Sequence, residues 1–242
     1  MMPRMIRNAV HLTLAAGLLA SPALAQDAQE EFEPVAAPPS WSFVIGAGTD
    51  NRSKDVSKSA GDPFAFAEAE WTSGDGRVYF APAVETVKSG GARWEATAAA
   101  GFRPQLMGFD LDLNVAHKWR VDADPGQDSR AWELTADVMR SIGPLEGRIR
   151  VQYSPDGTGA TESWTWTEAR IGWEFRPGLE ITTAVGRRQQ ENAIDYTGWN
   201  AGVTWDMTRD LALDVRWHDT DAPPSAGENY DGALVATISR YF

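Results

Sequence analysis

The sequence predicts an all-β fold, a transmembrane up-and-down antiparallel β-barrel of about twelve strands. Three observations predict it. Apolar and polar residues alternate with a period of two, turn-forming residues separate the alternating runs, and aromatic residues gather near the ends of those runs. Successive side chains of a strand point to opposite faces, so this pattern gives each strand one apolar face and one charged face.

The first 25 residues have the features of a cleavable signal peptide. Two arginines precede a short apolar stretch at 9–19, and an Ala-Leu-Ala sequence with the small-residue pattern of a cleavage site ends at Ala25. Residues 26–40 then combine acidic residues with three prolines and have little to bury, which is typical of a flexible periplasmic linker. We therefore expect the barrel to occupy residues 41–242.

Twelve alternating runs follow, most of them 9–12 residues long, which is the length that a tilted strand needs to cross a bilayer. They cover residues 41–49, 63–71, 77–87, 92–103, 109–121, 130–140, 145–153, 163–176, 179–188, 196–205, 211–218 and 231–242. Tight turns such as 177–178 alternate with longer loops such as 154–162 and 219–230, as in outer-membrane barrels. An even number of strands places both chain ends on the short-turn, periplasmic side.

A soluble β-sandwich also alternates and is the alternative fold. Its buried face is usually rich in large branched residues, whereas the apolar face here carries small residues at mid-strand, as at Ala96, Ala98 and Ala100. Aromatic residues near both strand ends match the girdles of a membrane barrel and favour that fold. Those assigned to the long-loop rim are Trp94, Trp119, Trp132, Tyr153, Trp164, Trp199 and Trp217.

Composition argues against several functions. The 242 residues include no cysteine, which removes disulfides, thiolate metal sites and cysteine catalysis. A formal net charge of −12 argues against nucleic acid as a partner. After signal cleavage the histidines are His117 and His218, which parity places on opposite faces, and no catalytic or cofactor-binding motif is present. We expect no enzyme activity, no catalytic residues, no cofactor and no metal.

The charged face must point inward, because an Arg or Lys facing hydrocarbon at mid-bilayer costs about 2–4 kcal/mol. Basic and acidic residues are nearly balanced on this face. The residues expected to line the lumen are Arg93, Glu95, Arg103, Asp110, Asp112, Lys118, Arg120, Glu133, Asp137, Arg148, Arg150, Glu168, Arg170, Arg188, Asp214 and Arg216. Twelve strands lie between the filled interior of eight strands and the aqueous channel of 16–18 strands.

Such a lumen is compatible with two functions. One is a porin-like channel for passive diffusion of small hydrophilic solutes or ions. The alternative is a structural or surface-interaction barrel whose salt-bridged lumen is closed. Arg148 and Arg150 share one face of a strand and need acidic neighbours; Glu133 and Asp137 are the expected partners from the preceding strand, with Glu168 from the following strand.

Five short motifs are spread along the expected barrel. They lie at 49–63, 153–156, 195–199, 218–221 and 239–242. The first follows the first expected strand and ends in Asp-Pro, the second is the loop sequence Tyr-Ser-Pro-Asp, and the third is an Asp-Tyr-x-x-Trp strand start. In this order the five motifs resemble those of the TorF family of porins. The resemblance implies an outer-membrane pore and names no solute.

The expected location is the bacterial outer membrane, reached through the cleavable signal peptide. The expected partners there are outer-membrane lipid and lipopolysaccharide, together with small hydrophilic solutes. Phe242 ends an alternating strand and resembles the signal read by the barrel assembly machinery, which is a further expected partner.

Overall fold

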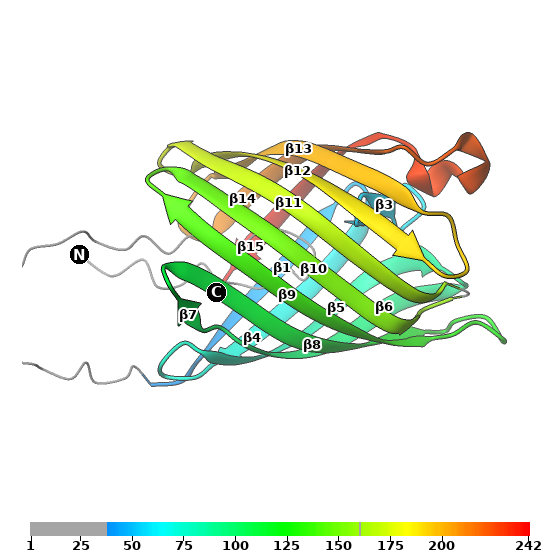
Figure 1. The fold of residues 1–242 in the computed structure, drawn as a ribbon, viewed down its shortest axis with the longest axis horizontal. Helices are drawn as coiled ribbons and strands as arrows, with labels where there is room; N and C mark the ends of the chain where they lie inside the picture. Colours follow the sequence, from blue (N-terminus) through cyan, green and yellow to red (C-terminus); the bar gives the residue numbers. More distant parts are fainter. Residues whose placement is uncertain (1–37, 160) are drawn as a thin grey trace, which may run out of the picture.

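A computed structural model describes residues 38–159 and 161–242 of the chain, and the structural statements below refer to these residues. The predicted signal peptide and nearly all of the predicted linker lie outside them. Within this part of the chain, twelve long strands form one closed antiparallel barrel, which confirms the predicted fold class (Figure 1). The long strands are β1 (Ser40–Gly48), β4 (Phe64–Thr72), β5 (Val78–Ser89), β6 (Ala92–Phe102), β8 (Phe109–Val121), β9 (Arg130–Ile142), β10 (Leu145–Gly157), β11 (Glu162–Arg176), β12 (Leu179–Gln190), β13 (Tyr196–Asp206), β14 (Leu211–Thr220) and β15 (Ala233–Tyr241).

The remaining elements are short. Strands β2 (Arg52–Ser53) and β3 (Val56–Ser57) pair with each other after β1, and β7 (Gln105–Leu106) pairs with the start of β8. Two single-turn 3₁₀ helices, η1 (Pro224–Ala226) and η2 (Glu228–Tyr230), lie between β14 and β15. No helix in the described residues is long and apolar enough to cross a membrane.

Each long strand pairs with its neighbours in the chain, and the first pairs with the last. In the closing pair, Val44 of β1 lies opposite Tyr241 of β15. Beside it, the Phe43 N–H donates to the Phe242 carbonyl at 3.4 Å, and the Phe242 N–H donates to the Phe43 carbonyl at 2.9 Å. Closure leaves no free sheet edge, which is the condition for a sheet to span a bilayer.

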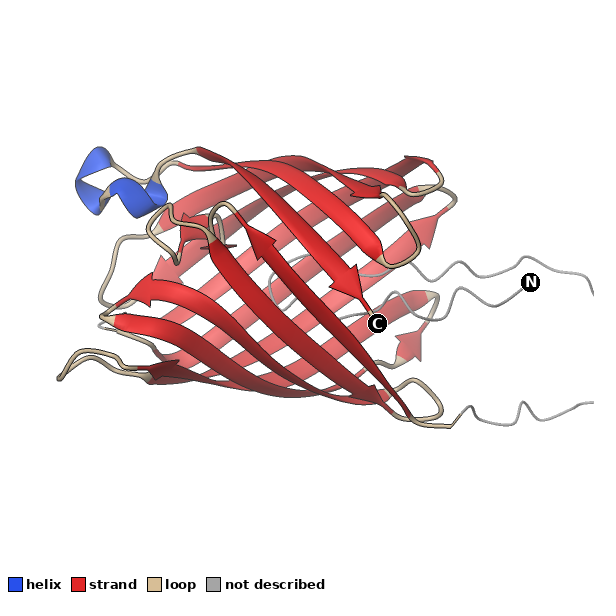
Figure 2. Ribbon diagram, turned by 180° about the vertical axis from the view of Figure 1, so that it is seen from behind, coloured by secondary structure: helices blue, strands red, loops and turns tan. Residues whose placement is uncertain are grey.

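The two ends of the barrel differ. Short turns such as 143–144 and 177–178 lie at the end where β1 starts and the chain terminates. The opposite end carries the longer connections, including the one with η1 and η2 (Figure 2). The predicted alternation is confirmed for 49–63, 122–129 and 221–232, but the connections 90–91, 158–161 and 191–195 at the same end are as short as the turns, because β10 and β11 extend into the expected loop 154–162.

The outer surface is apolar and the inner surface is charged. In β10, for example, Ile149 is 53% exposed while its neighbour Arg148 is 6% exposed. This division follows from the period-two pattern, because a charge facing lipid would lose its solvation without a partner. Aromatic residues are exposed near both rims, among them Trp132 and Trp173.

The assignment of Trp164 to the outer rim is wrong. Trp164 is 4% exposed and packs inside the barrel with Trp166 and Tyr196. The reason is parity, because Trp164 lies on the same face of β11 as the charged residue Glu168. Its closeness to a strand end does not decide which face it occupies.

Candidate pore and its constricting loop

Most of the residues expected to line the lumen lie on the inner face. Seven are buried: Glu95, Lys118, Glu133, Asp137, Arg148, Arg170 and Arg216. Eight are partly buried: Arg103, Asp110, Asp112, Arg120, Arg150, Glu168, Arg188 and Asp214. Arg93 is exposed at the start of β6, where the register of the β5–β6 pair shifts between Thr86 and Ser89. Arg93 therefore lies apart from the buried charged face.

Two ion pairs lie side by side on the inner wall of the barrel, on strands β9, β10 and β11. Arg150 donates to both carboxylate oxygens of Asp137, at 2.7 and 2.6 Å, and Arg148 donates to Glu168 at 2.6 Å. Both pairs join adjacent strands and match two of the three expected partners. The Trp166 indole donates to the second oxygen of Glu168 at 3.3 Å.

The expected pairing of Glu133 with these arginines is wrong. Glu133 is bound instead by Lys118, at 3.1 Å. The cross-strand register explains the difference, because Glu133 lies opposite Ala116 of β8, next to Lys118, while Asp137 lies opposite Arg150 of β10. Two pleat repeats, about 13 Å, separate Glu133 from Asp137 along β9.

A second cluster of charges lies toward the short-turn end. The Arg103 guanidinium binds both oxygens of Glu70 at 2.8 Å and contacts Asp112 at 3.1 Å. The Tyr79 hydroxyl donates to Asp112 at 2.7 Å, and its ring lies 3.9 Å from the Arg103 carbon Cζ. Such a bidentate pair is geometrically specific, and the cluster joins side chains of β4, β5 and β8 to Arg103, the residue that follows β6.

The connection between β1 and β4, residues 49–63 and hereafter loop 1, folds into the barrel. Although polar, it contributes several of the most buried side chains, and Asp55 is 3% exposed. Inside the loop, Asp50 accepts hydrogen bonds from Arg52 at 2.7 Å, Ser57 at 2.6 Å and Ser59 at 2.8 Å. These bonds satisfy polar groups that burial would otherwise leave unpaired.

Loop 1 is also fixed to the barrel wall on two sides. On the β5 side, Asn51 donates to Glu85 at 2.8 Å, and the Lys58 ammonium contacts Glu85 and also Glu95, the latter at 2.8 Å. Burial would lower the pKa of Lys58, but Glu85 and Glu95 outweigh it and raise that pKa above its ordinary value. Lys58 therefore stays charged and holds the loop against two strands.

On the other side, the tip of loop 1 contacts β13 and β14. Asp55 accepts a hydrogen bond from Asn200 at 2.8 Å and lies 2.8 Å from Nδ1 of His218, and the Tyr196 hydroxyl donates to the Lys54 carbonyl at 2.9 Å. The tip itself is the two-residue turn between β2 and β3, in which Lys54 has φ 54° and Asp55 has φ 66°. Positive φ is disfavoured for residues other than glycine, so the wall contacts hold a conformation that the turn resists on its own.

Two cavities border loop 1. The mouth cavity lies at the long-loop end, has a volume of about 330 Å³, and is lined on its loop 1 side by Ser53, Lys54 and Lys58. The inner cavity, of about 70 Å³, is lined by Asp50 and Arg52 from the same loop and by residues of β14, β15 and β4. Loop 1 therefore stands between two spaces of the barrel interior.

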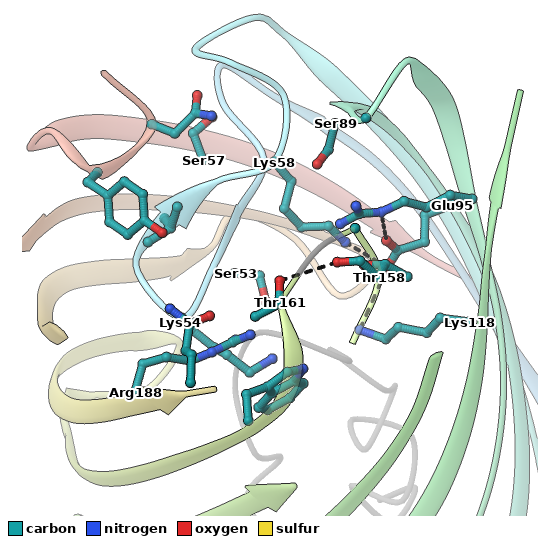
Figure 3. A pocket seen from close by; sticks show the side chains of 18 of the residues that line it. Ser53, Lys54, Ser57, Lys58, Ser89, Glu95, Lys118, Thr158, Thr161 and Arg188 are labelled. Atoms are coloured by element: carbon teal, nitrogen blue, oxygen red, sulfur yellow. Dashed lines mark hydrogen bonds and ion pairs between the residues drawn. The ribbon is translucent and has the colours of Figure 1, made fainter. Parts of the chain in front are cut away.

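Figure 3 shows Lys54 and Arg188 on one side of the mouth cavity and Glu95 with Lys118 on the other. Burial lowers the pKa of Lys54 to about 7; nearby Glu133 opposes this shift, while Lys118, Arg188 and Lys58 add to it. In the described residues, no cluster of three or more His, Asp or Glu side chains is arranged to hold a metal ion.

Sequence reasoning missed loop 1 as a part of the lumen. Its residues are mostly polar and charged, a composition that normally indicates an exposed loop. One feature of the sequence pointed to its burial. Between Asp50 and Ser59, acidic, hydroxyl and basic residues lie close together, so that their side chains can form hydrogen bonds and ion pairs with one another. Such a segment can bury its polar groups without leaving them unpaired.

Solved structures of outer-membrane channels share this fold. The "KdgM porin" superposes with a TM-score of 0.59 at 6% sequence identity, over 83% of this chain and 99% of that one. The "NanC porin" gives 0.56 at 8% identity, over 81% and 97%. The "COG4313 outer membrane channel from Pseudomonas putida F1" gives 0.52 at 11% identity, over 90% and 100%. At these identities the likeness is one of fold.

Sequence comparisons identify the family. No curated protein sequence matches the chain significantly. A family model described as "Bacterial protein of unknown function (Gcw_chp)" matches residues 57–242, which include all the long strands except β1. The chain therefore belongs to the Gcw_chp family.

Proposed function

We propose that this protein is an outer-membrane channel through which small hydrophilic solutes or ions diffuse passively, and that loop 1 sets its narrowest part. The observation that carries the proposal is the position of loop 1. It is folded into a closed barrel between two cavities, and it is bonded to β5 on one side of β1 and to β14 on the other. A charged, water-compatible inner face around such a loop is what a narrow aqueous pore requires.

The outer face supports the location. Exposed apolar residues cover the strands, and aromatic residues lie near both rims, as in barrels that span the bacterial outer membrane. Lipid and lipopolysaccharide would contact this surface. The exposed C-terminal Phe242 at the closing strand pair is the proposed recognition point for the barrel assembly machinery. The motif resemblance to TorF porins supports the same assignment.

A closed structural barrel is the second candidate, and one observation favours it. Buried ion pairs such as Arg150 with Asp137 line the inner wall, and loop 1 adds a packed segment inside the barrel. A lumen filled in this way could hold the barrel's shape without passing solute.

Single-channel recording of the refolded chain in planar bilayers separates the two candidates. A channel gives steady conductance steps, which increase when the wall contacts of loop 1 are removed. A barrel that shows the heat-modifiable gel mobility of a folded barrel but conducts nothing, with or without those contacts, contradicts the channel proposal.

A further inference from the structure

The mouth cavity carries more positive than negative charge. Its described lining includes the cations Lys54, Lys58, Lys118, Arg120 and Arg188 and the carboxylates Glu95 and Glu133. Both carboxylates are already occupied. Glu95 lies 2.8 Å from Lys58 and 3.3 Å from Arg120, and Glu133 lies 3.1 Å from Lys118.

Two cations of the cavity are left without an acidic partner. Neither Lys54 nor Arg188 has a carboxylate within 4.0 Å among the described residues. Instead, both stand over the Trp164 ring, the Lys54 ammonium at 4.3 Å and the Arg188 guanidinium at 3.9 Å from its centre. The Nε of Arg188 is buried and has no hydrogen-bond partner.

The closeness of these two cations carries an electrostatic cost. Two like charges beside one aromatic ring repel each other, and the ring compensates for only part of the lost hydration. An anion beside both cations would offset this repulsion. Charge-assisted hydrogen bonds from Arg and Lys to a carboxylate are the strong ones in such a setting.

The rest of the lining suits an organic solute with hydroxyl groups. Ser53, Thr161 and Tyr196 supply hydroxyls, and Gln127 and Gln190 supply amides. The Trp164 indole also borders the cavity, but it is 4% exposed and supports the two cations more than it faces the space. A volume of about 330 Å³ falls at the lower end of small-ligand pockets.

We propose that Lys54 and Arg188, held against the Trp164 ring, form a binding site for a small hydroxylated carboxylate, whose charged group meets the two cations and whose body contacts the polar wall. This inference rests on the proposed channel function, and it names the class of solute that binds at the outer mouth of the channel.

The test is calorimetric titration of the refolded full chain in detergent micelles. The probes are gluconate, a carboxylate with a hydroxylated chain, sorbitol, which has a similar chain without the charge, and inorganic phosphate. We expect saturable binding of gluconate, none of sorbitol, and weaker binding of phosphate. Equal binding of sorbitol, or of phosphate, overturns the assignment to a hydroxylated carboxylate.

Variants locate the site. Arg188→Gln removes a cation, and Lys54→Glu places a carboxylate beside Arg188, where the new internal pair supports the fold. Each should weaken gluconate binding by about tenfold or more, the effect of losing a charge-assisted bond. Lys88→Met is the matched control, because Lys88 lies at the same end of the barrel with an exposed side chain paired to Asp62. Gluconate binding that is unchanged in both cavity variants contradicts the site.

The binding site and the channel function can be tested independently of each other. A barrel that conducts but does not bind gluconate overturns the site and leaves the channel. A barrel that binds gluconate through Lys54 and Arg188 but conducts nothing keeps the site and overturns the channel.

Discussion

The carboxylate of Asp55 and the imidazole of His218 lie 2.8 Å apart, although 163 residues separate them in the chain. Asp55 stands at the tip of loop 1 and His218 on the wall strand β14, and both side chains are buried. Asn200 of β13 donates to the same Asp55 oxygen at 2.8 Å. Three elements therefore meet at one carboxylate.

Removing this carboxylate should loosen the constriction. Asp55→Ala takes away both wall bonds and leaves His218 and Asn200 with unpaired groups, at a cost of about 1–3 kcal/mol each. The turn with positive φ then loses its restraint. We expect a higher and noisier single-channel conductance than in the wild type.

Asp75→Ala is the control for this experiment. Asp75 is an acidic residue of an exposed turn at the other end of the barrel, where it accepts a hydrogen bond from Ser73. Its conductance should equal that of the wild type. If Asp55→Ala also conducts like the wild type, loop 1 does not set the constriction.

The buried ion pairs should dominate stability. The side chains of Arg150 and Asp137 are 13% and 6% exposed, against 57% and 51% for Arg240 and Asp210 at the short-turn rim. Arg150→Ala leaves a buried carboxylate unpaired and should lower the free energy of unfolding by about 3–5 kcal/mol. Arg240→Ala removes a surface pair and should cost at most about 1 kcal/mol.

Urea unfolding in lipid vesicles measures both effects. Replacing the two partners together, as in Arg150→Met with Asp137→Leu, should recover most of the loss, because no charge remains uncompensated. If Arg150→Ala and Arg240→Ala lower the free energy of unfolding equally, the pair of Arg150 and Asp137 is as well hydrated as a surface pair.

Ion selectivity should depend on pH through Lys54. Its pKa of about 7 means that the ammonium is mostly charged below that pH and mostly neutral above it. Glu133, Lys118, Arg188 and Lys58 surround it, so its charge adds to an already positive mouth. Preference for anions should therefore be stronger at about one unit below pH 7 than at about one unit above it.

Reversal potentials in a salt gradient measure this preference. Lys54→Met should remove the pH dependence around neutrality and leave the protein as anion-selective as the wild type at high pH. A pH dependence that persists in Lys54→Met would assign it to another group.

Topology can be tested by cysteine labelling in this cysteine-free chain. Cysteines at the exposed positions Gln127, Asp156 and Ser225 should react with an impermeant reagent on intact cells, and one at Arg209 should not. Asp156 is chosen over the neighbouring Gly157, because a Cβ added at Gly157 would lie 2.7 Å from the Trp164 indole. If only Arg209→Cys is labelled, the barrel has the opposite orientation in the membrane, with its short turns outside the cell.

The strands and the inward face were predictable because both depend on local periodicity. The charged residues of β8 and of β10 share one face of each strand, and that face has only one acceptable direction in a membrane, whatever the neighbouring strands do. The partner of Glu133 was not predictable, because it depends on strand register. A period of two is equally satisfied when a strand is shifted by two residues along its neighbour, so the pattern does not choose between such registers. The burial of loop 1 depends on contacts with β5, β13 and β14, far away in sequence.

The anchoring of loop 1 also has a kinetic consequence. Its partners Glu85, Asn200 and His218 come from early and late strands, and they surround the loop only when β15 has paired with β1. Contacts of such long sequence separation form late, because the chain must first lose the entropy of closing a large loop. We therefore expect the tip of loop 1 to dock onto β13 and β14 late in folding, so that a barrel whose first and last strands have not yet paired does not have loop 1 fixed on that side.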